Sequence, residues 1–264
     1  MEHESSIHDF DFSLICRYFS LLRRQGPGSD AITRKALSLI PTGLSVSKAA
    51  DLGCGTGTQT MVLAEGLQER QNADNLEITA LDLFPQFLDI LSLRSRERGL
   101  DGIIGCQPGD MSQLPFQNGS LDLIWSEGAI YNVGFRSGLE QWKRFLRPGG
   151  CIAVSDATWL TNERPAEVEE FWRDAYPQIG TTSERLAIME ELGFTVLGTI
   201  LLPDSCWTEN FYAPAVAAQE QFLSENAGNE FAEELVRNQR HEAEIFRKYH
   251  EYYGYVFYIG QKLK

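Results

Sequence analysis

Residues 49–60 constrain the fold most, because three glycines stand there at alternate positions. An apolar lead-in ends at Asp51, the glycines follow at 53, 55 and 57, and a helical pattern comes next. Glycine is needed where a chain turns at positive φ or where a ligand touches the backbone. A strand, a glycine turn and a helix N-terminus place free N–H groups beside a crevice. The stretch therefore predicts an α/β sheet that binds a nucleotide-like ligand.

The acid and the glycine spacing narrow the choice of ligand. The dinucleotide fingerprint has its third glycine three positions after the second, where this chain has Thr58. A carboxylate at Asp51 would repel a pyrophosphate at close range and would favour a cationic amino group. The stretch resembles the D-x-G-x-G-x-G signature of class I S-adenosylmethionine-dependent methyltransferases. A glycine-rich turn in some other α/β protein is the alternative interpretation of the loop taken alone.

Apolar periodicity predicts strands that alternate with helices along most of the chain. The expected strands are 48–52, 77–82, 103–107, 121–125, 151–156, 193–201 and 255–259. The expected helices are 10–24, 29–39, 59–67, 85–98, 138–146, 162–176 and 181–192, followed by a largely helical insertion at 204–250. The resemblance extends by motif over residues 48–202. It implies an α/β fold with a Rossmann-like, seven-stranded, mostly parallel sheet and an antiparallel last strand.

Two additions to this core are expected. Residues 1–47 form an N-terminal helical cap, and 48–264 form a Rossmann-like methyltransferase domain with the insertion at 204–250, all as one continuous structural unit. Such N-terminal helices cover the active-site mouth in many class I methyltransferases, and simple packing on the sheet is the alternative. The insertion is expected to act as a lid or a dimer contact. Its aromatic residues at helical spacing favour a place in the core. The loop 26–29 is a weaker candidate for close approach to a ligand.

Asp82 ends the second expected strand. In nucleotide-binding α/β sheets, an acid at that place accepts hydrogen bonds from the ribose hydroxyls. A carboxylate that faces a diol makes charge-assisted bonds, which are stronger than neutral ones. Leu83 and Phe84 follow and are expected to pack on the adenine face. The alternative role for Asp82 is to cap the helix that begins near Pro85.

The third expected strand leads into Gly109, Asp110 and Met111. This resembles the next signature of the family, in which an acid accepts from the adenine amino group and the following residue packs against the ring. The resemblance gives Asp110 the first role and Met111 the second. The alternative for Asp110 is a solvated acid in a turn.

The loop after the fourth expected strand lies where methyl donor and acceptor are expected to meet, at the switch point of the sheet. Glu127 is the nearest ionisable candidate for a base or a contact to an amine, and Tyr131 and Asn132 are candidates to orient the acceptor. The alternative is that Glu127 caps the next helix and Tyr131 fills the core. The predicted catalytic residues are Glu127, Tyr131 and Asn132. The predicted cofactor-binding residues are Asp51, Gly53, Cys54, Gly55, Gly57, Thr58, Asp82, Leu83, Asp110, Met111, Glu127 and Gly128.

Composition limits the partners. A net charge of −14 and the lack of any basic run argue against nucleic acid. No C-x-x-C occurs among the five scattered cysteines, and the four histidines lie away from the expected crevice, so no metal site is predicted. Neither a signal peptide nor an apolar stretch of membrane-spanning length is visible. A reduced, cytoplasmic protein without a membrane contact is therefore expected.

A Pro-Gly-Gly turn, expected before residue 151, completes five family features in the right order. The chain resembles small-molecule methyltransferases of the ubiquinone-biosynthesis-like group. It lacks the Asn- or Asp-Pro-Pro-Tyr motif and the Pro-Cys dipeptide of nucleic-acid methyltransferases. The resemblance implies transfer of a methyl group from S-adenosylmethionine to a small-molecule acceptor by in-line displacement. The alternative is a non-catalytic S-adenosylmethionine-binding protein, a sensor or a scaffold. A homodimer is also among the expected assemblies.

Overall fold

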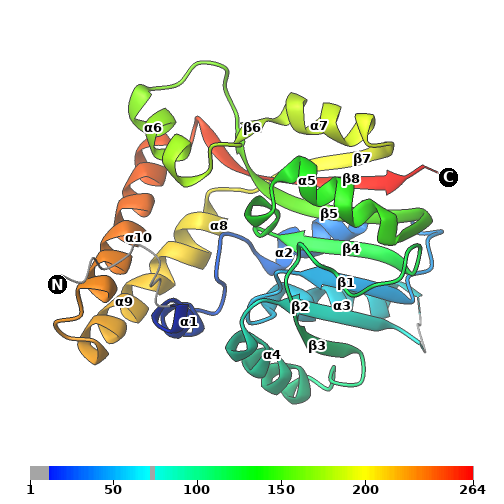
Figure 1. Ribbon diagram of the computed structural model, residues 1–264, viewed down its shortest axis with the longest axis horizontal. Coiled ribbons are helices and arrows are strands. Elements are labelled where there is room, and N and C mark those ends of the chain that lie inside the picture. Colours follow the sequence, from blue (N-terminus) through cyan, green and yellow to red (C-terminus); the bar gives the residue numbers. More distant parts are fainter. Residues whose placement is uncertain (1–11, 72–74, 264) are drawn as a thin grey trace, which may run out of the picture.

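One mixed sheet organises the computed structural model, which describes residues 12–71 and 75–263 (Figure 1). The strands are β1 Lys48–Leu52, β2 Glu77–Asp82, β3 Ile104–Pro108, β4 Leu121–Glu127, β5 Leu146–Trp159, β6 Gly180–Thr181, β7 Phe194–Leu201 and β8 Tyr253–Lys262. The helices are α1 Phe12–Ser20, α2 Asp30–Ser38, α3 Thr58–Gln71, α4 Pro85–Glu97, α5 Phe135–Trp142, α6 Ala166–Ala175, α7 Thr182–Glu191, α8 Ser205–Trp207, α9 Ala213–Glu225 and α10 Glu230–Tyr249. Short helical turns lie at Ile130–Asn132, Lys143–Phe145 and Thr208–Tyr212.

The strand order across the sheet is β3-β2-β1-β4-β5-β8-β7. The neighbours from β3 to β5 pair in parallel, whereas β8 runs antiparallel to both β5 and β7. The predicted Rossmann-like sheet with an antiparallel last strand is therefore confirmed. The two-residue strand β6, which pairs with β5, was not predicted, because two residues carry no periodic signal. The order reverses between β1 and β4, which opens a crevice at the carboxyl ends of these strands.

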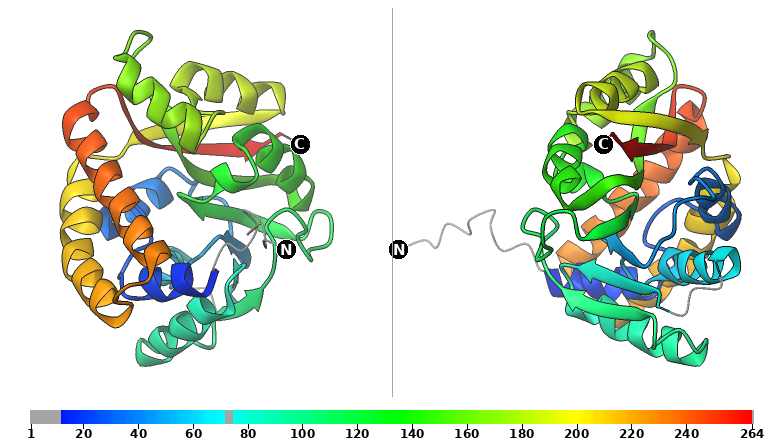
Figure 2. Two further views of the ribbon diagram at one scale, coloured as in Figure 1. Left: turned by 60° about the vertical axis from the view of Figure 1, so that its left-hand side comes forward. Right: turned by 90° about the vertical axis from the view of Figure 1, so that its right-hand side faces the viewer.

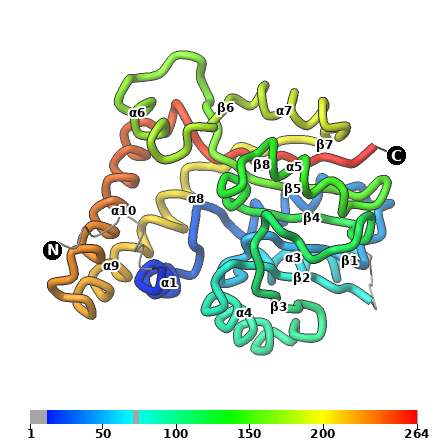
Figure 3. Tube along the Cα trace, viewed as in Figure 1, coloured from blue at the N-terminus to red at the C-terminus, as the bar shows by residue number. Residues whose placement is uncertain are grey.

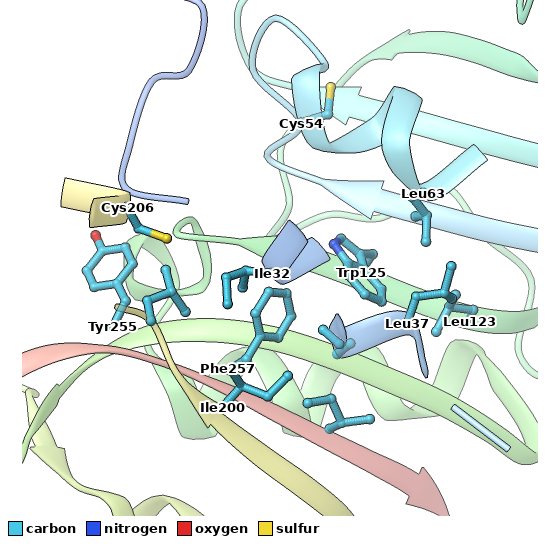
Figure 4. Close-up of a cluster of buried hydrophobic side chains, with 14 of the residues drawn as sticks. Ile32, Leu37, Cys54, Leu63, Leu123, Trp125, Ile200, Cys206, Tyr255 and Phe257 are labelled. Atoms are coloured by element: carbon cyan, nitrogen blue, oxygen red, sulfur yellow. The ribbon is translucent and has the colours of Figure 1, made fainter. Parts of the chain in front are cut away.

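Alternating residues of the central strands face two separate apolar layers. Leu123 of β4 packs in one cluster with Leu63 of α3 (Figure 4). Its neighbour Ile124 points to the opposite face, where Leu139 of α5 belongs to a second cluster. This alternation follows from the period of two in a strand. Both faces of the sheet are covered, which explains why the strands read as apolar runs.

A third apolar cluster joins the two ends of the chain. Tyr18 of α1 packs with Phe222 of α9, and Val236 of α10 belongs to the same cluster. Figure 2 shows α1 lying against the pair formed by α9 and α10, beyond the ends of the parallel strands. The N-terminal cap and the insertion therefore form one helical layer. Trp207 and Phe211 are buried, which agrees with the predicted core role of the insertion's aromatics.

Several predicted boundaries were wrong for local reasons. The helix expected at 10–24 ends at Ser20, and Phe10 lies outside the described residues. The helix expected at 162–176 begins only at Ala166, because a proline at 165 disfavours helical backbone at the residue before it. The turn expected at 147–150 is part of β5, where Gly149 takes a φ of 78° and the register with β4 shifts.

No helix in the described ranges is both long and apolar enough to cross a membrane.

Substitution of Gly57 by alanine is expected to destabilise the fold strongly. Its φ is 78°, and a Cβ at this position would stand 2.0 Å from Leu91 Cδ1. We expect a loss of at least about 3 kcal/mol in the free energy of unfolding, from backbone strain plus overpacking. The matched control is Gly99→Ala, where φ is 68° and nothing lies within 4 Å, so only about 1 kcal/mol should be lost. Urea unfolding measures both, and equal losses would contradict the packing argument.

Candidate functional site

A cavity of about 640 Å³ lies at the carboxyl ends of β1 to β4. Its floor comes from the loops that follow these strands, at residues 53–55, 82–84, 109–111 and 127–133. Its apolar wall is made by two helices and the turn before one of them: Phe12, Ile15 and Phe19 of α1, Phe87 of α4, and Phe84 just before α4. Small-molecule sites commonly have such a volume and an apolar lining with a few polar groups.

The glycine loop offers no free N–H group between residues 53 and 57. The N–H groups of residues 53 and 54 both donate to Leu81 O, at 2.8 and 3.1 Å. The N–H of Gly55 donates to Asp82 Oδ2 at 2.8 Å, and that of Thr56 donates to Gln25 Oε1 at 3.0 Å. The N–H of residue 57 donates to Cys54 O. The expectation of free donors beside the crevice was wrong here, and the loop lacks the donor set with which phosphate-binding turns hold their ligand.

Close approach explains why two of the glycines lie at the cavity. A Cβ on Gly53 would stand 2.5 Å from Ala129 Cβ, and one on Gly55 would stand 2.5 Å from Gln25 Oε1. Both line the cavity together with Cys54. Gly57 is absent from the lining and packs against α4. Thr58 is also absent, because its hydroxyl donates to Arg23 O and ties the loop to the cap.

Asp82 lines the cavity at the carboxyl end of β2. Its Oδ2 accepts from Gly55 N–H, and its Oδ1 accepts from Phe84 N–H at 3.0 Å. Burial raises the pKa of the carboxyl, and its backbone donors offset part of this rise. Phe84 is the N-cap residue of α4 and makes no side-chain capping bond, so Asp82 does not cap this helix. Each carboxylate oxygen keeps a lone pair for a further donor.

The predicted adenine contacts also line the cavity. Leu83 and Met111 contribute apolar side chains, and Leu83 is 59% exposed at the mouth. Asp110 is exposed, and its Oδ1 accepts from Ser112 N–H at 2.7 Å. This bond holds the pKa of Asp110 below its usual value. Asp110 is therefore both an acid in a turn and a charged group at the cavity edge.

Glu127 is held by three side chains from distant parts of the chain. Its Oε1 accepts from Thr33 Oγ1 at 2.7 Å and from Trp125 Nε1 at 2.9 Å. Its Oε2 lies 3.5 Å from the buried guanidinium of Arg24. Burial raises the pKa of Glu127, and Arg24 offsets part of the rise. The alternative role as a helix cap was wrong, because Ala129 is the N-cap of the following turn.

The rest of this loop faces the cavity as well. Tyr131 lines it and is 40% exposed, so the alternative of a core residue was wrong. Asn132 lines it and donates through Nδ2 to Ala129 O at 2.9 Å. Gly128 has a φ of 61°, and a Cβ there would stand 3.0 Å from Tyr255 Cε2. The loop thus places the Gly128 backbone, the Tyr131 phenol and the Asn132 amide at one end of the cavity.

Asp51 lies behind the glycine loop, outside the cavity lining. It is completely buried, its Oδ2 accepts from Thr60 Oγ1 at 2.7 Å, and its Oδ1 has no hydrogen-bond partner. Burial raises its pKa to about 8, and the charges of Glu127 and Asp82 add to the rise.

Sequence analysis missed the polar residues of the cap that reach the site. Gln25 donates to Thr56 Oγ1 at 3.0 Å and to the carbonyls of Phe19 and Leu22, besides accepting from Thr56 N–H. Arg24 joins Glu127 and also donates to Asp30 at 2.9 Å. Figure 3 shows the segment after α1 running past α8 toward the sheet, where Gly28 N–H donates to Cys206 O. The only sign of these contacts in the sequence was that Arg24 and Gln25 directly precede the glycine-rich loop.

No group of three or more His, Cys, Asp or Glu that would suit a metal ion occurs in the part of the chain that the structure describes.

The buried carboxyl of Asp51 should make stability fall as pH rises. Its pKa is about 8 in the folded chain against an ordinary value of 3.8, so the folded state holds more protons between these values. The free energy of unfolding then decreases across this window. Asp51→Asn should flatten this decrease relative to the unsubstituted protein, whereas the exposed control Asp89→Asn should not. Urea unfolding at about pH 5 and pH 8 measures the difference. An unchanged pH dependence in Asp51→Asn would contradict the burial argument.

Comparisons with known proteins agree with this architecture. Residues 50–154 match the family described as a methyltransferase domain. A malonyl-acyl-carrier-protein O-methyltransferase of Methylococcus capsulatus is 32% identical over 155 residues, covering 56% of this chain and 52% of the relative. A demethylmenaquinone methyltransferase of Deinococcus radiodurans is 27% identical over 150 residues, covering 56% of this chain and 59% of the relative.

The fold extends further than the sequence similarity. A crystal structure described as a SAM-dependent methyltransferase of Geobacter sulfurreducens in complex with S-adenosyl-L-homocysteine matches with a TM-score of 0.76. The match is 21% identical and covers 94% of this chain and 97% of that one. The chain spans only about half the length of the curated relatives that it matches. Residues 50–154 therefore resemble a methyltransferase domain, and the chain as a whole shares the fold of that solved structure.

Proposed function

We propose that this chain transfers a methyl group from S-adenosylmethionine to a small-molecule acceptor by in-line displacement. The observation that carries the proposal is the pairing of Asp82 with a glycine loop whose N–H groups are already hydrogen-bonded. A carboxylate at this place suits a ribose, and a loop without free donors does not suit a pyrophosphate. A nucleoside that carries a sulfonium in place of phosphates meets both conditions.

The cavity offers a partner for each part of that ligand. Asp82 would accept from the ribose hydroxyls, and the backbone of residues 53–55 would lie beneath them. Leu83 and Met111 would pack on the two sides of the adenine, and Asp110 would accept from its amino group. The tight approach at Gly53 and Gly55 supports this fit, because any side chain there would collide with its neighbours.

When bound, S-adenosylmethionine supplies a methyl group that its positive sulfur already makes electrophilic. The residues of this chain then have to position the acceptor and exclude water. Holding two reactants in line contributes roughly 7–11 kcal/mol in well-oriented systems. Tyr131 and Asn132 are placed to orient the acceptor, and the layer formed by α1, α9 and α10 covers the site as a lid.

Glu127 serves as an anchor and an amine contact in this proposal. One of its oxygens accepts two hydrogen bonds, and the other faces Arg24, so its carboxylate is fixed rather than free to collect a proton. Asp51 supports the same end of the site from behind the loop. Its unpartnered Oδ1 and raised pKa describe a carboxyl that gains from a positive charge nearby.

The acceptor is proposed to be small, because the cavity is enclosed by α1 and the loop at residues 24–27. The division into a cap at 1–47 and a domain at 48–264 stays a prediction. The same holds for the cytoplasmic location, the homodimer and the lack of nucleic-acid binding.

Asp82→Asn should weaken the binding of S-adenosylhomocysteine. The amide keeps one acceptor oxygen but loses the charge, and charge-assisted bonds to two hydroxyls are worth about tenfold to a hundredfold in affinity. Isothermal titration calorimetry measures the effect, with the exposed Asp89→Asn on α4 as the matched control. Equal affinities for Asp82→Asn and the unsubstituted protein would remove the ribose assignment.

Turnover separates an enzyme from a sensor or scaffold. Incubation with methyl-labelled S-adenosylmethionine and a metabolite extract should transfer label to small molecules and accumulate S-adenosylhomocysteine, and Asp82→Asn should slow both. Saturable binding of the donor without label transfer in extracts of several origins would favour the non-catalytic alternative. Titration with NADH should show no saturable binding, since the loop lacks free phosphate donors.

A further inference from the structure

Two side chains, Tyr131 at the cavity and Glu242 of α10, indicate a further internal space. Tyr131 belongs to the cavity lining, and burial raises its pKa, with the charge of Glu242 on α10 adding to the rise. Tyr131 is 40% exposed and Glu242 is half-buried, although protein atoms surround both side chains closely. Such residual surface indicates an internal space between the loop after β4 and α10. The acceptor is expected at this end of the site.

Glu242 pairs with no cationic side chain of residues 12–71 and 75–263. Its Oε1 accepts from the Tyr212 hydroxyl at 3.0 Å, and among the described residues no Lys, Arg or His forms an ion pair with it. Burial raises the pKa of the carboxyl. A carboxylate that is largely removed from water and unpaired is costly, so a positive charge beside it would be strongly favoured.

Tyr212, which donates to the carboxylate, belongs to a cluster of aromatic rings. The rings of Tyr131 and Tyr176 lie 5.9 Å apart between centroids. The ring of Trp207 lies 6.1 Å from Tyr212 and 4.8 Å from Tyr255. Figure 4 shows Tyr255 next to Cys206 of α8, at the edge of the buried cluster. Faces of tyrosine and tryptophan carry negative potential, which attracts organic cations.

A buried hydroxyl without a partner among the described residues lies in the same aromatic cluster. Tyr253 is completely buried, and its hydroxyl has no hydrogen-bond partner among the described residues. Burial raises the pKa of this phenol, and the charge of Glu242 adds to the rise. Buried hydroxyl groups nearly always have a partner in folded proteins. A donor or an acceptor from a ligand would supply one here.

The other buried charges nearby cancel. Asp156 Oδ2 lies 2.9 Å from Arg185 Nη2, and both side chains are almost fully buried. Tyr176 donates to Asp156, which ties this ion pair to the aromatic wall. The Asp156–Arg185 pair carries no net charge. Glu242 therefore makes the electrostatic potential in the hollow negative.

We propose that the hollow bounded by Glu242, Tyr131, Tyr212 and Tyr255 holds an ammonium group of the methyl acceptor. The inference rests on the proposed function and narrows its substrate class to small organic cations and amines. The carboxylate provides the opposite charge, and the rings replace the water that the cation loses on entry.

The test compares choline with 3,3-dimethyl-1-butanol. This alcohol has the shape of choline but carries carbon in place of the charged nitrogen. Binding of each is measured by calorimetry or ligand-observed NMR to the full chain saturated with S-adenosylhomocysteine. Choline should bind about tenfold more tightly than the alcohol. Glu242→Gln should abolish this preference, because it keeps the shape and the acceptor for Tyr212 but removes the charge. Glu244→Gln, on an exposed position of the same helix, should retain it.

Each outcome decides one claim. Equal binding of the two probes to the unsubstituted protein, or a choline preference that survives in Glu242→Gln, would overturn the inference. Should Glu242→Gln fail to fold, the probe comparison on the unsubstituted protein still decides. Binding of S-adenosylhomocysteine is measured in every variant. If it fails in the unsubstituted protein, the proposed function fails; if it persists without a choline preference, only the ammonium site does.

Discussion

The hydrogen bonds of the glycine loop hold the site together. The loop follows β1, yet its N–H groups are accepted by the end of β2 and by Gln25 of the N-terminal cap. One short turn therefore joins two strands and the cap without any ligand. Backbone groups that are buried need partners, and here protein atoms provide all of them. The loop is thus formed in advance and can be approached closely by an apolar or sugar surface.

The cap and the insertion depend on each other. α1 precedes the sheet, and α9 and α10 interrupt it before the last strand, but their apolar sides form one cluster. The far end of α10 also packs in the main core, through Ile245 and Phe246. Arg24 links the cap to the sheet, because its guanidinium lies 3.5 Å from Glu127 at the end of β4. The end of the cavity at Glu127 is consequently built from three segments that are far apart in the sequence.

Much of the sheet could be predicted, because parallel strands covered on both faces give apolar runs that end at recognisable turns. Asp82 was predictable as a cavity residue from its place at a strand end, and Met111 from the resemblance of residues 109–111 to the family signature. The partners of Glu127 were not predictable. Thr33 lies 94 positions away, and no local pattern tells which hydroxyl will meet which carboxylate. The burial of Asp51 and the unpaired charge of Glu242 likewise depend on tertiary packing, which periodicity does not report.

The segment around Gly28 has a consequence for turnover. A Cβ at this glycine would stand 3.0 Å from Arg24 Nη1, its carbonyl accepts from Asn210, and its N–H donates to Cys206 O. The segment at residues 24–28 is therefore held at Gly28 by the insertion and at Arg24 by Glu127 at the end of β4. In the proposed function, exchange of S-adenosylhomocysteine for S-adenosylmethionine would require the contacts of Gly28 and Arg24 to open together. In the proposed function, opening of this segment rather than methyl transfer would then limit the rate of turnover.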